Sequence, residues 1–226
     1  MYILALSDIH EKISKLKTLA EVLVDRGIKS DVVVVAGDLT YFKTVDTAVK
    51  ILEKTRQLFN TMVLFIPGNC DPVELLNVRN IGGNIVNLHG TTLELNGVVF
   101  SGIGGSGITP FNTMIEFSEV ELRELVENMY LSLQRFKDHV KIVVTHQPIY
   151  GFFDEINGVN TGSRVFREYL DRIKPILWIT GHIHEHSGWI SRGETIILHP
   201  GPLMKGYYGL VKITDGRVES IEINKV

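Results

Sequence analysis

The chain places carboxylate, amide and imidazole side chains directly after five apolar, strand-like runs. These side chains are Asp8, His10, Asp38, Asn69, His146, His182 and His184. In a parallel α/β sheet the carboxyl ends of the strands share one edge, where ligands bind, so we expect all seven side chains to meet there. Residues two apart on extended backbone point the same way, which predicts that Asp8 lies beside His10 and His182 beside His184.

Nitrogen and oxygen donors in this number are too many for one tetrahedral metal ion, but they suit two ions that share a carboxylate. Imidazole mixed with carboxylate and amide favours Mn, Fe, Co, Ni or Zn over Mg, which prefers oxygen ligands. The predicted cofactor is therefore a pair of divalent transition-metal ions. Taken singly, Asp8 or Asp38 has an alternative as a loop carboxylate and His146 as a hydrogen-bonded histidine. The placement of the whole set after five strands favours the metal interpretation.

The elements that must position these residues alternate between two periods. The apolar runs 2–6, 32–36 and 62–66 are typical of buried strands, and apolar residues at helical spacing follow over 16–24 and 45–58. This alternation predicts right-handed crossovers and a mainly parallel sheet. Further along, Asn96-Gly97 predicts a type I′ hairpin, and Ser118 with Glu121 predicts a capping box. The tail from Trp189 predicts short antiparallel strands, so we expect an α/β fold with a second sheet.

Composition narrows the classes of function. The 226 residues carry 23 Lys+Arg against 26 Asp+Glu, for a formal charge of −3, which argues against bulk electrostatic binding of nucleic acid. The apolar runs are far shorter than the roughly 18 residues that span a bilayer, and the N-terminus does not resemble a signal peptide. The single cysteine, Cys70, excludes an internal disulfide and fits a reducing compartment. We therefore expect a cytoplasmic, single-domain protein over residues 1–226 with no membrane partner, and a homo-oligomer stays open.

From Asp8 to His184 the chain carries five motifs, which are in order D-x-H, G-D, G-N-x-D, a lone His and G-H-x-H. This series resembles the calcineurin-like metallophosphoesterase superfamily. The Asn-Cys-Asp form of the third motif is similar to that of small prokaryotic phosphoesterases. The resemblance implies two mixed β-sheets packed as a sandwich and flanked by α-helices. It also implies two ligand sets that share Asp38. One set is Asp8, His10, Asp38 and His184, and the other is Asp38, Asn69, His146 and His182.

The implied activity is metal-dependent hydrolysis of a small-molecule phosphoester, a nucleotide being one candidate, by attack of a metal-bridging hydroxide on phosphorus. The implied catalytic residues are Asp38, Asn69, Cys70 and His146. Many family members have a histidine in place of Cys70 that stabilises or protonates the leaving group. Nearby cations and a helix N-terminus would favour a thiolate, which cannot donate a proton. This departure shifts the expected substrates toward phosphodiesters, and an equal alternative makes Cys70 a small space-filling residue.

Other residues near the motifs have a structural interpretation as well as a functional one. Asp71 with the following Pro-Val-Glu predicts a helix N-cap, the alternative being that Asp71 holds a metal-bound histidine in place. Gly102–Gly107 has the form G-x-G-x-x-G, but no helix opens at once, so we expect a mobile loop near the site and no dinucleotide. His186 is expected to be a partly exposed strand histidine, with substrate contact as the alternative, and His89 and His199 are expected to be structural.

Aromatic residues after the fourth motif leave two interpretations open. Tyr150, Phe152 and Phe153 either stack on an aryl group or base of the substrate or pack within a loop.

Two further function classes share this chemistry or fold. A catalytically inactive protein-interaction scaffold, like a retromer subunit that resembles the superfamily, is expected to lose ligand residues, and this chain keeps all seven. A DNA-repair nuclease is expected to carry an added domain or a basic stripe, and the sequence shows neither. A phosphodiesterase is therefore the favoured interpretation, and the scaffold is its alternative.

Overall fold

Short runs rich in valine, isoleucine and leucine form the central strands of two β-sheets. The computed structural model describes residues 1–226. The strands are β1 (Tyr2–Leu6), β2 (Val32–Ala36), β3 (Met62–Ile66), β4 (Asn80–Ile81), β5 (Ile85–Asn87), β6 (Thr92–Leu95), β7 (Val98–Ile103), β8 (Ser106–Gly107), β9 (Glu116–Phe117), β10 (Val140–Thr145), β11 (Glu155–Ile156), β12 (Val159–Asn160), β13 (Leu177–Ile179), β14 (Gly188–Arg192), β15 (Thr195–His199), β16 (Tyr207–Thr214) and β17 (Arg217–Lys225). The helices are α1 (Ile13–Asp25), α2 (Val45–Phe59), α3 (Glu119–Leu133) and α4 (Arg164–Ile173), with 3-10 helices η1 (Val73–Asn77) and η2 (Leu203–Lys205).

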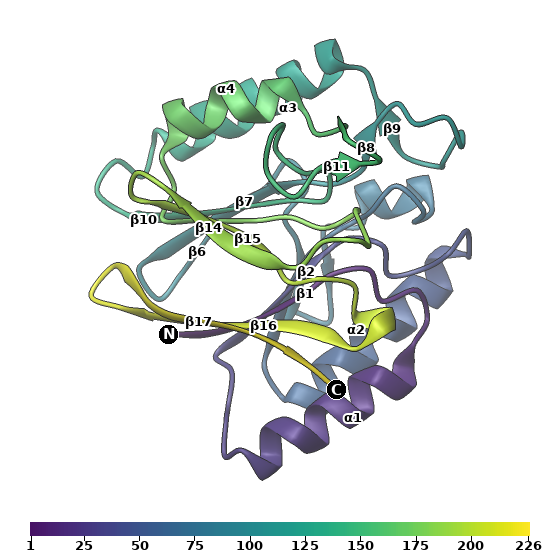
Figure 1. Ribbon diagram of the computed structural model, residues 1–226. Helices are drawn as coiled ribbons and strands as arrows, with labels where there is room; N and C mark the ends of the chain where they lie inside the picture. The colour runs from purple at the N-terminus through teal and green to yellow at the C-terminus, as the bar shows by residue number, and fades with distance from the viewer.

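The two large sheets pack face to face, with a pair of helices outside each. The seven-stranded sheet has the order β17-β16-β1-β2-β3-β5-β4, and the six-stranded sheet has the order β14-β15-β13-β10-β7-β6. Figure 1 shows α1 and α2 on the outer side of the first sheet and α3 and α4 on the outer side of the second. The fold is therefore the predicted sandwich of two mixed sheets flanked by α-helices.

Three apolar clusters fill the spaces between these four layers. In β1, Ile3 and Ala5 belong to the cluster between the sheets, whereas Leu4 and Leu6 belong to the cluster beneath α1 and α2. A third cluster, which includes Trp178, lies between the six-stranded sheet and the helices α3 and α4. Because both faces of the central strands are covered, these strands are apolar throughout. Each large aliphatic side chain buried in this way contributes roughly 1.5–3 kcal/mol.

Most of the elements expected from the sequence are confirmed. The three predicted strands over 2–6, 32–36 and 62–66 match β1, β2 and β3, and Ser118 forms the predicted capping box with Glu121. Asn96 and Gly97, with φ of 52° and 79°, join β6 and β7 as the predicted hairpin turn. The tail is antiparallel only in part, because β15 pairs parallel to β13.

Three expectations from the sequence stay predictions: the single domain, the cytoplasmic location and the homo-oligomer. None of the four α-helices combines the length and the apolar character needed to cross a membrane.

The parallel strands of both sheets end at one common edge, where backbone bonds join the loops that follow them. Asp8 N donates to Gly37 O (3.0 Å), which joins the ends of β1 and β2. Gly181 N donates to His146 O (3.1 Å), which joins the ends of β13 and β10. This edge holds every residue of the predicted metal site.

Candidate metal centre

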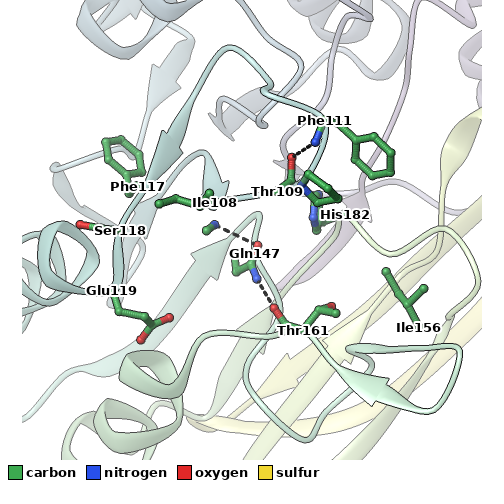
Figure 2. Close-up of a pocket in the computed structure, with 12 residues that line it drawn as sticks. Ile108, Thr109, Phe111, Phe117, Ser118, Glu119, Gln147, Ile156, Thr161 and His182 are labelled. Atoms are coloured by element: carbon green, nitrogen blue, oxygen red, sulfur yellow. Dashed lines mark hydrogen bonds between the residues drawn. The ribbon is translucent and has the colours of Figure 1, made fainter.

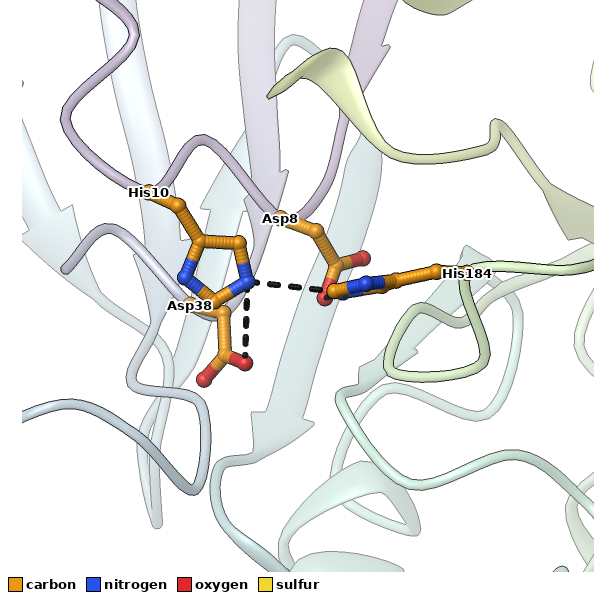
Figure 3. Close-up of side chains that lie close together, drawn as sticks. All are labelled: Asp8, His10, Asp38 and His184. Atoms are coloured by element: carbon orange, nitrogen blue, oxygen red, sulfur yellow. Dashed lines mark hydrogen bonds and ion pairs between the residues drawn. The ribbon is translucent and has the colours of Figure 1, made fainter. Parts of the chain in front are cut away.

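Four of the predicted ligands form one compact group at the ends of β1, β2 and β13. Their donor atoms all lie within 4.8 Å of one another, a spacing that suits a single metal ion. The group consists of Asp8, His10, Asp38 and His184 (Figure 3). His10 Nε2 lies 3.4 Å from His184 Nε2 and 3.5 Å from Asp38 Oδ2, and His184 Nε2 lies 3.2 Å from Asp8 Oδ1.

The remaining three predicted ligands gather around the side-chain oxygen of Asn69. Asn69 Oδ1 lies 2.9 Å from His146 Nε2 and 2.8 Å from His182 Nδ1. His146 Nε2 also lies 3.5 Å from Asp38 Oδ1. On the far side of its ring, His146 Nδ1 donates to the carbonyl of Ala36 at 2.8 Å, and this bond directs Nε2 toward Asn69 and Asp38. The structure thus brings all seven predicted residues together.

The backbone achieves this convergence in a way that the sequence pattern did not indicate. Asp8, His10, Asp38 and His182 all have positive φ, between 42° and 77°, in the left-handed region that non-glycine residues rarely adopt. The expectation that Asp8 and His10 share one side of extended backbone is therefore wrong, because β1 ends at Leu6. Strained backbone of this kind costs about 1–3 kcal/mol per residue and is concentrated at functional sites.

A glycine makes room for the Asp38 carboxylate. A Cβ atom on Gly68 would overlap the Asp38 side chain and the Asp38 backbone nitrogen. Only glycine therefore allows the loop after β3 to pass so close to the loop after β2.

Histidine side chains stabilise the negative charges of the two buried aspartates. Burial is the largest single influence and raises the pKa of each aspartate. The lowering influences together outweigh it: for Asp8 they are led by the hydrogen bond from His184, and for Asp38 by the charge of His146. Both pKa values therefore lie below the ordinary value. Burial lowers the pKa of His146, but the Asp38 carboxylate raises it to about 9. The site thus favours two carboxylates and a positive charge between them.

The donor set fits metal ions. Asp8 and Asp38 are 0% and 2% exposed, and their ion pairs are with His10, His146 and His184, without lysine or arginine. Buried carboxylates side by side are stable only with compensating positive charge, which a divalent cation supplies.

Cys70 lies beside this group, and its predicted thiolate, which depends on bound cations, stays a prediction. Its backbone N–H donates to Asp38 Oδ1 at 2.9 Å. Burial, followed by the negative charge of Asp38, raises the pKa of the Cys70 thiol. The helix expected to favour the thiolate is only η1, a short 3-10 helix. The protein groups around Cys70 thus favour the neutral thiol, which is a weak hydrogen-bond donor.

Asp71 is not the predicted helix cap. Pro72 precedes η1 without any side-chain cap, and Asp71 instead accepts from three backbone N–H groups, those of Leu39 (3.1 Å), Thr40 (2.8 Å) and Gly68 (2.8 Å). Thr40 Oγ1 also donates to Asp71, at 3.0 Å. Burial and the charge of Asp38 raise the pKa of Asp71 to about 7. Asp71 therefore holds together the loops after β2 and β3.

The remaining sequence candidates lie outside the ligand group. Gly102–Ser106 are buried, so the expected mobile loop is wrong for these residues, while the absence of an adjoining helix is confirmed. His186 Nε2 donates to the carbonyl of Glu155 at 2.8 Å. The rings of Tyr150 and Phe152 lie beneath arginine side chains of α4, which agrees with the packing alternative.

Ser7 is a supporting residue that the sequence analysis missed, since a serine inside an apolar strand exit carries no distinctive signal. Its hydroxyl donates to Asp8 Oδ2. We expect Ser7→Ala to weaken metal binding about tenfold, because the buried carboxylate loses the donor that orients it. Calorimetric titration with Mn²⁺ measures this affinity. Ser14→Ala, at an exposed position in α1, is the matched control, and equal affinities for the two variants would contradict the role of Ser7.

His89 is structural, as predicted, and gives the protein a pH-dependent stability. His89 Nδ1 accepts from Gly104 N at 3.0 Å, and burial, followed by the charge of Arg79, lowers the pKa of His89 to about 4. The unfolded chain binds this proton more tightly than the folded chain does. The contribution of neutral His89 to the free energy of unfolding is therefore fully present above about pH 6.5 and is lost as the pH decreases toward 4. In urea unfolding, we expect the difference in the free energy of unfolding between the wild type and His89→Gln to decrease by about 1.4 kcal/mol from pH 7.5 to pH 5.5.

The control for this measurement is His139→Gln, which alters an exposed histidine. Its difference from the wild type should stay constant over the same pH range. A constant difference for His89→Gln as well would show that His89 is not held neutral.

His199 is also structural, as predicted. It donates from Nε2 to Gly181 O at 2.9 Å and accepts at Nδ1 from Gly201 N at 3.1 Å. These bonds fix the loop that leads into His182.

Comparisons with known proteins agree with this site. The family model described as calcineurin-like phosphoesterase matches residues 1–186, which include all seven residues of the group. An uncharacterized protein of Methanocaldococcus jannaschii is 31% identical over 186 residues, which cover 79% of this chain and 80% of the relative.

Two solved structures share the fold. The protein TT1561 of Thermus thermophilus has a TM-score of 0.73 at 19% identity, with 99% of this chain and 98% of that chain covered. A dimetal phosphatase from Danio rerio has a TM-score of 0.65 at 10% identity, with 95% and 93% covered. With the match over residues 1–186 and the convergence of its motifs at one edge, this chain belongs to the calcineurin-like phosphoesterase family, whose members are metal-dependent phosphoesterases.

Proposed function

We propose that this protein is a phosphodiesterase that uses two divalent transition-metal ions, Mn²⁺ among them. The observation that carries the proposal is the position of Asp38 between the two donor groups. Its Oδ2 lies 3.5 Å from His10 Nε2, and its Oδ1 lies 3.5 Å from His146 Nε2. A single carboxylate that faces two sets of ligands is the arrangement that two adjacent metal ions require. The likeness in fold to a dimetal phosphatase supports the same count.

The proposed ligand sets are those implied by the motifs. Asp8, His10, Asp38 and His184 would hold one ion, and Asp38, Asn69, His146 and His182 would hold the other.

The chemistry divides between the ions and the chain. Two bound cations would lower the pKa of a water molecule and neutralise the charge that builds on the phosphate oxygens. The chain supplies orientation: the Ala36 carbonyl fixes the ring of His146, and the backbone N–H of His182 donates to Asp8 Oδ2 at 3.2 Å. Preorganised ligands of this kind cost no rearrangement during the reaction.

The preference for diesters rests on Cys70. A poor leaving group, such as the alkoxide of an alkyl monoester, needs a proton donor as the bond to phosphorus breaks. The Cys70 thiol is a weak hydrogen-bond donor, and burial raises its pKa, which makes it a poorer general acid. A diester with a stabilised leaving group does not need that donor.

The proposal is tested by metal content and by substrate comparison. The protein is stripped with a chelator, reloaded with Mn²⁺, Ni²⁺, Co²⁺ or Zn²⁺, and assayed with bis(p-nitrophenyl) phosphate and p-nitrophenyl phosphate. We expect two bound ions per chain and a kcat/KM at least about tenfold higher for the diester. A single ion per chain would contradict the shared carboxylate, and a preference for the monoester would contradict the diester assignment.

A further inference from the structure

A cavity of about 410 Å³ opens directly beside the metal centre. His182, which contacts Asn69, forms part of its wall. Figure 2 shows His182 together with side chains from the loop after β8, from the start of α3 and from the β11–β12 hairpin. A cavity of this size falls within the range of small-ligand sites in proteins.

The outer wall of the cavity presents apolar side chains to solvent. Ile108 and Phe111 are 75% and 80% exposed, and Ile156 is 39% exposed. The loop that carries Ile108 and Phe111 is braced from within, because Glu116 Oε1 accepts from Thr109 Oγ1 at 2.6 Å. The same oxygen accepts from the backbone and the hydroxyl of Thr113. Apolar side chains that a braced loop holds in water beside a reactive centre are typical of a ligand site.

The polar groups of the cavity are already committed to the protein. Gln147 accepts from Gly107 N at 3.2 Å and donates to Thr161 O at 2.7 Å, so it joins the two loops that form opposite walls (Figure 2). The carboxylate of Glu119 accepts from Val165 N at 3.0 Å. No lysine or arginine lines the cavity. An additional phosphate or carboxylate bound here would therefore meet a carboxylate and no compensating cation.

We infer that this cavity binds the second ester group of a phosphodiester and selects an uncharged aromatic group there, an inference that rests on the proposed function. With the phosphate at the metal centre, the ring lies against Ile108, Phe111 and Ile156 on the His182 side. A substrate with a second anionic group at this position is disfavoured.

The test separates the cavity from the reaction by using inert ligands. Three phosphinates have P–C bonds that resist hydrolysis, a single anionic centre for the metal ions, and one common methyl group. They are dimethylphosphinate, methyl(phenyl)phosphinate and methyl(4-carboxyphenyl)phosphinate. Calorimetric titration of the Mn²⁺-loaded protein should give affinity about tenfold higher for the phenyl ligand than for the dimethyl ligand, and affinity below the phenyl value for the carboxyphenyl ligand.

Variants assign the preference to the cavity. Phe111→Ala should reduce the phenyl preference severalfold, and Ile108→Lys should reverse the order of the phenyl and carboxyphenyl ligands because it adds a cation to the wall. Val120→Ala, at an exposed apolar position in α3 outside the cavity, should keep the wild-type order. Equal affinities for the phenyl and dimethyl ligands would overturn the inference. A full wild-type phenyl preference in Phe111→Ala together with the wild-type order in Ile108→Lys would overturn it as well.

The proposed function is tested separately with methyl p-nitrophenyl phosphate. Hydrolysis of this diester without a phenyl preference among the phosphinates would leave the phosphodiesterase standing and remove the cavity assignment. A phenyl preference without hydrolysis of any diester would leave the cavity assignment standing and remove the phosphodiesterase.

Discussion

Asp38→Asn is expected to abolish the binding of both metal ions and to lower the kcat/KM for a diester at least about a thousandfold. Asparagine keeps the shape of the side chain and an oxygen that accepts from Cys70 N, but it removes the negative charge that faces both His10 and His146. In the proposed ligand sets this carboxylate belongs to both donor groups, so one substitution should empty both. Metal content after gel filtration and steady-state kinetics measure the two effects.

A ligand that belongs to one donor group provides the matched comparison. His184 contacts Asp8 and His10, and it belongs to the proposed ligand set that does not include Asn69 and His146, so His184→Ala should lower the metal content to one ion per chain. Asp46→Asn, in the first turn of α2, should keep the metal content of the wild type. If Asp38→Asn retained one ion at wild-type affinity, Asp38 would not be shared, and the two-ion proposal would lose its central observation.

The convergence of these seven side chains was predictable from the sequence because its signal was topological. Where parallel strands end is set by the length of each apolar run, and those runs were visible at 2–6, 32–36 and 62–66. Polar residues placed just after such runs must meet at one edge whatever the details of the loops. The capping box at Ser118 and the turn at Asn96-Gly97 were predictable for a similar reason, since each depends on contacts only a few residues apart.

The local conformation of the site was not predictable from the same patterns. Positive φ at Asp8 and Asp38 is imposed by bonds between loops, such as Ile9 N to Asp38 O at 2.8 Å, which join residues far apart in the sequence. A periodicity rule for extended backbone contains no information about such bonds. The cavity beside His182 was also missed, because its walls come from separate segments of the chain.

Asp71 is the clearest case in which local pattern and tertiary contact compete. Asp-Pro-x-Glu is a common start for a helix, and the sequence therefore predicted a cap. In the structure the carboxylate turns toward the loops after β2 and β3, where its oxygens satisfy backbone donors that would otherwise be buried without partners. Asp71 is 0% exposed, so water cannot replace it in this role.

Asp71→Ala is expected to lower the free energy of unfolding by about 3–5 kcal/mol and to weaken metal binding as well. The substitution leaves the N–H groups of Leu39, Thr40 and Gly68 without their acceptor, and it frees the two loops that carry Asp38 and Asn69. Urea unfolding measures the first effect, and Mn²⁺ titration under folding conditions measures the second.

The size of the loss distinguishes the two roles of Asp71. Removing a helix cap costs only about 1 kcal/mol and would leave a metal site untouched. Asp25→Ala, which removes an exposed carboxylate at the end of α1, should cost less than about 0.5 kcal/mol and keep wild-type metal affinity. A loss near 1 kcal/mol with unchanged Mn²⁺ affinity would support the cap and contradict the connection between loops. A severalfold larger loss accompanied by weaker Mn²⁺ binding would mean that this buried carboxylate keeps the loops after β2 and β3 close enough for Asp38 and Asn69 to bind the same ion.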